Sequence, residues 1–223
     1  MPNQKIIIIG PAFPFRGGIA NFNNALAKAY NDRGDDVTLF SFTLQYPSFL
    51  FPGTTQYEKG NPPSNLKIRT LINSINPFNW IKIARKINKE SPDLVIIRYW
   101  LPFMSPCLGT ISRIVRSNKH TKVIVVVDNL IPHEKRIGDH ILNSYFVNSV
   151  DAFITMSKSV YNDLNQFDTH KKKLLGVHPL YDTFGKVKSK SEAKKALNLL
   201  DSTNYILFFG IIRKYKGLDI LLE

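Results

Sequence analysis

Near its start the chain carries a hydrophobic run followed by a glycine-rich loop, and residues 6–18 read Ile6-Ile7-Ile8-Ile9-Gly10-Pro11-Ala12-Phe13-Pro14-Phe15-Arg16-Gly17-Gly18. Four consecutive isoleucines predict a buried β-strand, because β-branched side chains favour extended backbone and an unbroken apolar run is covered on both faces. Gly10-Pro11 ends this strand, and Gly17-Gly18 leads straight into a helical pattern. A strand, a loop and a helix in this order are typical of the opening of an α/β domain.

The same alternation continues along the chain. Further strands are predicted at 37–42, 94–97, 123–127, 152–156 and 174–177. Between them, apolar residues recur at helical spacing, as in the set Trp80, Ile83, Ala84 and Ile87 and the set Ile137, Ile141 and Tyr145. Strands separated by helices predict a parallel sheet with helices on both faces, so the expected fold class is a Rossmann-like, doubly wound α/β sheet.

The last part of the chain repeats the opening pattern. A polar, Lys-rich stretch at 186–190 precedes a predicted helix at 191–200, a predicted strand at 205–209, a basic loop and a helix that starts near Leu218. A domain that opens in this way needs more strands to bury its sheet. We therefore expect a first domain at 1–185 and, at 186–223, the first strand and helix of a second Rossmann-like domain that is truncated.

Composition narrows the class of partner. Thirty Lys and Arg against seventeen Asp and Glu give a net charge of +13, which favours nucleic acid, a phosphorylated ligand or an acidic membrane. The single cysteine, Cys107, permits no disulfide within the chain and favours a reducing compartment. The run at 6–9 is too short for a signal peptide, and no stretch reaches the roughly 18 apolar residues of a membrane span. We expect a cytoplasmic protein, or one attached only to a membrane surface.

Two loops carry residues that suit ligand chemistry. The glycines at 17 and 18 would let an anion approach the backbone N–H groups of a helix start, and Arg16 adds a charge. The spacing is neither Gly-x-Gly-x-x-Gly nor a P-loop, so a plain tight turn is an equal alternative. The second loop, 128–136, follows the strongest strand, where parallel sheets place ligands. His133 there could exchange a proton, oriented by Asp128 or Glu134, or the segment could be a surface loop that caps a helix.

A third basic loop contains Arg213 and Lys216, which suit a diphosphate beside a helix start or could form a solvated turn. Together these segments resemble glycosyltransferase family 4, the retaining GT-B enzymes that move a sugar from a nucleotide-sugar donor to an acceptor. The resemblance rests on Gly17-Gly18, Pro92-Asp93, 128–134, 154–160, His178-Pro179-Leu180-Tyr181-Asp182 and 210–222.

The resemblance implies two Rossmann-like domains that face a cleft, with the acceptor on the first and the donor on the second. It implies His133 and Asp128 as the catalytic candidates. The candidate donor- and substrate-binding residues are Arg16, Gly17, Gly18, Asn129, Glu134, Arg213 and Lys216. Fixed cations lower the barrier by stabilising a diphosphate leaving group, so no metal or other cofactor is expected beyond the nucleotide sugar as co-substrate.

Two positions depart from the family pattern. Many relatives carry His-Asp or His-Asn where this chain has Asp128-Asn129, which shifts the sugar contact to His133 or removes it. Many also carry Arg where Ile211 stands, and Arg213 is the expected substitute. The family's Glu-x7-Glu donor element would fall beyond Glu223, so little or no transfer by these 223 residues alone is expected.

Other readings remain open. The helix around 80–89 places Lys82, Arg85, Lys86 and Lys89 opposite its apolar face, which would suit an anionic membrane or ordinary packing on the sheet. A Rossmann oxidoreductase is disfavoured because its glycine fingerprint is missing, and a nucleic-acid-binding protein has only the charge in its favour. A non-catalytic fragment that binds an acceptor or partner is the main alternative. Bacterial envelope polysaccharide synthesis, with a glycan or lipid-linked acceptor, is the role that the family and the charge suggest.

Overall fold

The computed structural model describes residues 3–47, 55–58, 60–132, 134, 136–180, 185–209, 212 and 216–223. The predicted site residues His133 and Arg213 lie outside these described residues. The chain divides into two compact units, Met1–Val177 and His178–Glu223, and each is described by itself.

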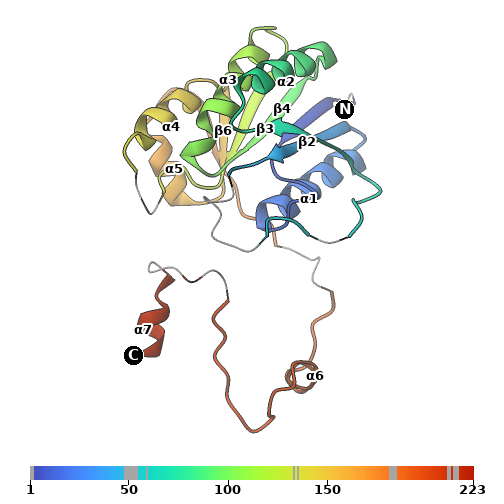
Figure 1. Cartoon of the computed structure of the whole chain (residues 1–223), viewed down its shortest axis with the longest axis vertical. Helices are drawn as coiled ribbons and strands as arrows, with labels where there is room; N and C mark the ends of the chain where they lie inside the picture. The colour runs from blue at the N-terminus through green and yellow to red at the C-terminus, as the bar shows by residue number, and fades with distance from the viewer. Residues whose placement is uncertain are drawn as a thin grey trace. The chain divides into compact units, whose positions relative to one another are not determined.

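The first unit is built on a seven-stranded parallel sheet (Figure 1). Its strands are β1 (Lys5–Ile9), β2 (Asp36–Leu44), β3 (Lys67–Asn73), β4 (Leu94–Tyr99), β5 (Lys122–Val127), β6 (Ala152–Thr155) and β7 (Lys172–Leu175). Their order across the sheet is β3-β2-β1-β4-β5-β6-β7, with every neighbouring pair parallel. The predicted α/β, Rossmann-like fold class is therefore confirmed.

Helices cover the two faces of the sheet unequally (Figure 1). Those of the first unit are α1 (Gly18–Asp32), α2 (Pro77–Glu90), the short 3-10 helix η2 (Pro102–Met104), α3 (Ser105–Arg116), α4 (Asp139–Val147) and α5 (Lys158–Leu164). One apolar core joins α1, through Ala27, to alternate residues of β1, β2, β4 and β5. The larger core, on the other face, contains buried residues of α2, α3, α4 and α5. This division follows from the right-handed crossovers on either side of β1.

Helix α2 forms as the sequence pattern predicts. Asn76 caps it, since its side-chain oxygen accepts hydrogen bonds from the backbone N–H groups of Phe78 and Asn79, at 3.0 and 3.2 Å. Pro77 stands at the first helical position, where no N–H is needed. The buried residues are Ile83, Ala84 and Ile87, on the predicted face, with Trp80 packed at its edge.

Helix α4 exists, but it buries a different face from the predicted one. Ile141 is 74% exposed and Ile137, just before the helix, is fully exposed, whereas Asn143, Phe146 and Val147 are buried. The polar Asn143 can occupy the core because its amide is satisfied there: it accepts from the Tyr99 hydroxyl and donates to the Leu130 carbonyl, at 2.7 Å to the latter. Apolar spacing alone could not identify such a face.

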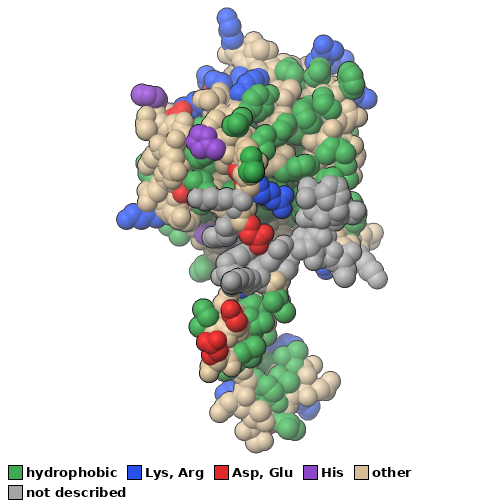
Figure 2. Space-filling view, turned by 60° about the vertical axis from the view of Figure 1, so that its left-hand side comes forward, with side chains coloured by type: hydrophobic (Ala, Val, Ile, Leu, Met, Phe, Trp, Pro, Cys, Tyr) green, Lys and Arg blue, Asp and Glu red, His purple; other side chains and the backbone are tan. Residues whose placement is uncertain are grey.

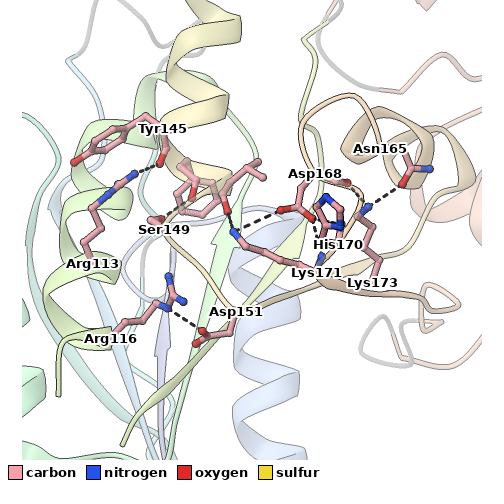
Figure 3. A network of polar contacts seen from close by, with 12 residues as sticks. Arg113, Arg116, Tyr145, Ser149, Asp151, Asn165, Asp168, His170, Lys171 and Lys173 are labelled. Atoms are coloured by element: carbon pink, nitrogen blue, oxygen red, sulfur yellow. Dashed lines mark hydrogen bonds and ion pairs between the residues drawn. The ribbon is translucent and has the colours of Figure 1, made fainter. Parts of the chain in front are cut away.

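The outer strands β6 and β7 are tied to the helices by a polar network (Figure 3). The Arg116 guanidinium donates to the Asp151 carboxylate at 2.8 Å, and the other Asp151 oxygen accepts from the Val123 N–H. Before β7, the Asp168 carboxylate accepts from the backbone N–H groups of His170 and Lys171, at 2.9 and 2.7 Å. This network stabilises the edge of the sheet with hydrogen-bonded charges where apolar cover is thin.

The second unit contains helix α6 (Lys190–Ala196) and helix α7 (Leu218–Leu222) among its described residues. Ser189 and Glu192 form a capping box at the start of α6. The predicted strand at 205–209 is wrong in one respect: its residues are not part of any sheet in the described chain, and Leu207 and Phe209 are 84% and 91% exposed. A strand is stabilised only by pairing with neighbours, and these residues have none. Among the described helices, none is long and apolar enough to cross a membrane.

Candidate functional site

The strand order marks one place where a ligand site is expected. Strands β2 and β3 extend the sheet to one side of β1, while β4, β5, β6 and β7 extend it to the other. The connections that leave β1 and β4 therefore run in opposite directions, and the carboxyl ends of these strands form the kind of switch point where open α/β sheets bind ligands. Three loop starts meet here: the segment after β1, the segment after β4 and the segment after β5.

The loop after β1 is held by hydrogen bonds to its neighbours. The Gly10 N–H donates to the Phe40 carbonyl at 3.2 Å, and the Ala12 N–H donates to the Ser41 hydroxyl oxygen at 3.1 Å. The buried Asn23 side chain of α1 donates to the Pro11 carbonyl at 2.8 Å. These contacts fix the path of the loop up to the start of α1.

Gly17 and Gly18 form the start of α1. Gly17 has φ +114°, a conformation that strongly favours glycine, and a Cβ atom at either position would meet nothing within 4 Å. No side chain caps the helix and no acidic residue stands in its first turn, so the local field favours an anion. Arg16 is exposed, and its backbone N–H donates to the Gln56 carbonyl at 3.0 Å.

At the end of β5, Asp128 pairs with a buried arginine. The Arg98 guanidinium donates through Nε to Asp128 Oδ2 at 3.0 Å and through Nη2 to Oδ1, so the pairing is bidentate. The side chain of Arg98 is 2% exposed and that of Asp128 is 20% exposed. The carboxylate is thus anchored from within the protein and reaches solvent on its other side.

Two residues further along the same loop, Leu130 is a second point at which the loop is held. Leu130 is fully buried, and its carbonyl accepts the hydrogen bond from Asn143. The Tyr99 hydroxyl donates to Asn143, so the Ser105 hydroxyl, 2.6 Å away, donates to Tyr99. Burial raises the pKa of Tyr99, which keeps the phenol neutral and able to donate. Two independent anchors, at 128 and 130, therefore hold the start of the loop that contains the predicted catalytic residues.

Arg98 also joins this loop to α1. Its guanidinium lies 4.1 Å from the ring centre of Phe22, in the first turns of α1. A Cβ atom added to Gly10 would lie 3.1 Å from the Arg98 Cβ and 2.5 Å from the Asn23 side chain, so only glycine leaves room for the arginine at this point. The three loop starts thus converge on one side chain.

Comparison with known proteins identifies the family of the chain. The model of the family described as "Glycosyltransferase Family 4" matches residues 16–183, which is most of the chain. The chain belongs to glycosyltransferase family 4. No curated protein sequence matches it significantly.

Solved structures of other proteins resemble this family 4 chain. Sucrose-phosphate synthase from Thermosynechococcus elongatus matches with a TM-score of 0.63 at 14% identity, over 90% of this chain and 54% of that one. UDP-N-acetylglucosamine 2-epimerase from Rickettsia bellii matches with a TM-score of 0.47 at 11% identity, over 77% of this chain and 44% of that one. The first match shares the Rossmann-like α/β fold with the present chain, which spans about half the length of that synthase.

The structure brings some predicted site residues of the family 4 chain together and leaves others apart. Asp128 and Asn129 lie at the carboxyl ends of the strands, as do Gly17 and Gly18. Glu134 is exposed in the same loop as Asp128. Lys216 is exposed in the second unit, so its distance from the first unit's site is not defined. The roles of all these residues remain predictions.

Sequence reasoning missed three polar residues that build the site: Arg98, Asn23 and Asn143. Arg98 carried a usable signal, because a charge in the otherwise apolar strand 94–97 and its continuation is unusual in a sheet buried on both faces. Asn23 and Asn143 stand inside helices and carried no comparable signal. Within the described ranges, no three His, Cys, Asp or Glu side chains are grouped to hold a metal ion, and metal independence remains a prediction.

Proposed function

We propose that this chain supplies the acceptor-binding side of a retaining glycosyltransferase of the hexosyltransferase type. The enzyme would move a sugar from a nucleotide-sugar donor to a glycan or a lipid-linked acceptor. The observation that carries the proposal is the anchored Asp128 carboxylate at the end of β5, beside the switch point between β1 and β4, in a family 4 chain. Family membership supports the reaction class, and the anchored carboxylate at the switch point supports the place.

The proposed roles follow from the chemistry of each group. Asp128, held by Arg98, would accept hydrogen bonds from sugar hydroxyls on its exposed side, since each carboxylate oxygen can accept more than one. His133, with Asn129 and Glu134 beside it in sequence, would contact the same sugar and act with Asp128 as the catalytic pair. The start of α1, with Arg16, Gly17 and Gly18, would receive an anionic group of donor or acceptor.

Arg213 and Lys216 would bind the diphosphate of the donor and stabilise the charge that develops on it as the sugar leaves. No metal enters this scheme, because two cations beside a helix start supply the same charge.

The second candidate function is binding of an acceptor or partner without turnover. One observation favours it: the second unit exposes its apolar side chains, among them Ile206, Leu207 and Phe209 at 80%, 84% and 91%. A donor site needs a packed sheet to position its cations. Incubation of the purified chain with UDP- and GDP-sugars tests this alternative: turnover would contradict it, whereas absence of turnover is expected for both functions.

We further propose that the chain lies in the cytoplasm and touches the inner face of an anionic cell membrane through α2. Phe78, 85% exposed, and the exposed Lys82, Arg85 and Lys89 stand at positions i, i+4, i+7 and i+11, which form one stripe of the helix. Beside the stripe is a shallow groove of about 460 Å³, lined by apolar Leu71 and Ile83 and by cations of α2.

An aromatic side chain followed by cations on one exposed stripe suits the interface of an anionic bilayer. The wider surface supports the same partner, since Lys and Arg side chains outnumber Asp and Glu on the visible face of the larger unit (Figure 2). Such a location would suit an enzyme of envelope polysaccharide synthesis with a lipid-linked acceptor. Nucleic acid is not a proposed partner.

Sugar binding tests the main proposal directly. Saturation-transfer NMR of the chain with methyl glycosides of common hexoses and N-acetylhexosamines is expected to reveal at least one millimolar ligand. Asp128→Asn should weaken its binding by about tenfold or more, because hydrogen bonds to a charged acceptor contribute roughly 1.5–3 kcal/mol. Asp36→Asn, at the amino end of β2 where it pairs with Lys67 at 2.6 Å, is the matched control and should bind as the parent does. A panel with no ligand, or equal losses in both variants, would contradict the proposal.

A further inference from the structure

Among the described residues of the first unit, Arg98 is the most deeply buried cation. It forms a bidentate ion pair with Asp128. Its side chain is 2% exposed, and it stands near the end of β4, a strand whose other residues are apolar or aromatic. Residues two apart on a strand share a face, so Arg98 lies on the same face as Ile96, which belongs to the core beneath α1. A charge in this position is unusual because desolvation disfavours it unless a partner is well placed.

The desolvation of Arg98 is offset by contacts with two other elements. Asp128, at the end of β5, accepts two hydrogen bonds from the guanidinium, one of them at 3.0 Å. Phe22, in α1, presents its ring to the guanidinium at 4.1 Å. A planar guanidinium can satisfy a carboxylate with its edge and an aromatic ring with its face at the same time, which a lysine ammonium cannot do.

A buried ion pair of this kind is not an efficient source of stability. Well-packed apolar residues of similar volume often stabilise a core as well or better, so a buried pair is better explained by what it positions. Here it joins the loop after β5 to the helix that begins with Gly17 and Gly18. These are the two segments that the proposed function assigns to the sugar and to an anionic group.

We propose that Arg98 is a positioning residue of the acceptor side: it holds the Asp128 carboxylate in one orientation and fixes loop 128–132 relative to the start of α1. The role of this positioning in sugar binding rests on the proposed function, whereas the positioning itself does not. Arg98 itself does not touch the sugar. It sets the direction in which Asp128 presents its exposed side, and it keeps the loop after β5 at a constant separation from α1.

Amide hydrogen exchange of the whole 223-residue chain tests the positioning. In Arg98→Met, exchange at 128–132 and at the first turn of α1 should rise by at least tenfold. The amides of β5 and of α3 should change much less, since their bonds do not depend on Arg98. In Arg98→Lys, the exchange rates of these amides should lie between those of the parent and of Arg98→Met, because lysine keeps the charge but loses the bidentate geometry. The control is Arg69→Met, which breaks an exposed pair with Glu90 at 2.7 Å and should leave 128–132 unchanged.

The variant Arg98→Met could fail to fold because it leaves Asp128 without its cation. Asp128→Asn and the double variant Arg98→Met/Asp128→Asn remove that charge, and both should show the same local rise in exchange. A uniform rise throughout the sheet would overturn the inference in favour of a purely structural role. A lysine variant as protected as the parent would overturn it too, since charge alone would then suffice.

Failure of this inference and failure of the proposed function are distinguishable. If no sugar binds while exchange rises locally, the function is wrong and the positioning holds. If sugar binds to Arg98→Met as tightly as to the parent, with unchanged exchange at 128–132, the function holds and the positioning is wrong. The expected result is the local rise together with at least tenfold weaker binding of the sugar identified by saturation-transfer NMR.

Discussion

The Asp128 carboxylate is held in place by Arg98, and the dependence is mutual. Loss of either side chain would leave the charge of the other in a region that water reaches poorly. The Arg98 side chain is 2% exposed and that of Asp128 is 20% exposed. Removing one partner of such a pair typically costs about 3–5 kcal/mol, whereas exposed pairs contribute about 0–1 kcal/mol.

We therefore expect Arg98→Met and Asp128→Ala each to lower the free energy of unfolding by about 3 kcal/mol, the low end of that range because Asp128 is partly solvated. The double variant Arg98→Met/Asp128→Ala should lose less than the sum of the two, since each single variant already breaks the same ion pair. Urea denaturation followed by circular dichroism measures all three. Additive losses would show that the pair is not coupled.

The residue scale is also where the sequence was least informative. Arg98 could have been noticed as a charge within an apolar strand, but nothing local indicates that its partner stands thirty positions away, at the end of another strand. Asn143 has the same difficulty, since an asparagine in a helix is usually exposed. Both are explained only by contacts that the topology creates.

Among the elements, β7 and the turn before it depend on the Asp168 carboxylate (Figure 3). Partial burial raises the pKa of Asp168, but hydrogen bonds from the Lys171 and His170 amides, with the charges of Lys171 and Lys173, outweigh it and lower the pKa below its ordinary value of 3.8. A carboxyl with a lowered pKa stabilises the folded state above that ordinary value, and the contribution disappears as pH falls through the folded-state pKa.

Asp168→Asn should thus be less stable than the parent near neutral pH, by roughly 1–2 kcal/mol given hydrogen bonds to a charged acceptor. The difference should shrink as pH falls below about 4, because the parent then loses the same contribution. Thermal unfolding at several pH values measures it. A difference that stays constant with pH would mean that the Asp168 charge has no part in holding the turn.

Helix α2 is the element that the membrane proposal concerns. The triple variant Lys82→Gln/Arg85→Gln/Lys89→Gln should bind anionic vesicles about 100-fold more weakly than the parent, at about 1 kcal/mol per cation near such a surface. Added to the triple variant, Phe78→Ser should weaken vesicle binding further without changing the salt dependence of that binding. Co-sedimentation with phosphatidylglycerol vesicles at low salt is the measurement.

Three exposed lysines of the second unit, Lys188, Lys190 and Lys195, provide a control with the same loss of charge. Their replacement by Gln should leave vesicle binding within about threefold of the parent, because these lysines belong to the other unit and are not part of the α2 stripe. Equal losses in both triple variants would show that net charge, and not the α2 stripe, attracts the membrane. Absence of binding by the parent would remove the membrane proposal altogether.

The elements also show which sequence patterns are reliable. The runs at 6–9 and 123–127 correctly predicted β1 and β5. Central parallel strands are buried on both faces, so their sequences are continuous apolar runs that are easy to recognise. Strand β3 was not predicted, since it lies at the edge of the sheet and its Lys-Ile-Arg-Thr pattern is half exposed. The face of α4 was assigned wrongly because a satisfied asparagine replaced an apolar residue in the core.

For the whole molecule, alternation of strands and helices was enough to predict the doubly wound sheet, because the connections between parallel strands leave few other topologies. The same reasoning predicts that ligands bind at the carboxyl edge of the sheet. It could not supply the side chains that line this edge, since they come from strands β4 and β5 and helices α1 and α4, distant in sequence. The second unit shows the limit: a strand pattern at 205–209 forms no ladder without neighbours.

The central claim is that a sugar binds at the carboxyl ends of β1, β4 and β5. Chemical-shift mapping of backbone amides in the 15N-labelled chain, titrated with the glycoside found by saturation transfer, tests it most directly. We expect the largest shifts at Gly17, Gly18, Asp128 and Asn129, and loss of these shifts in Asp128→Asn. Shifts concentrated at the opposite edge, around Arg116 and Asp151, or shifts that persist in Asp128→Asn, would contradict it.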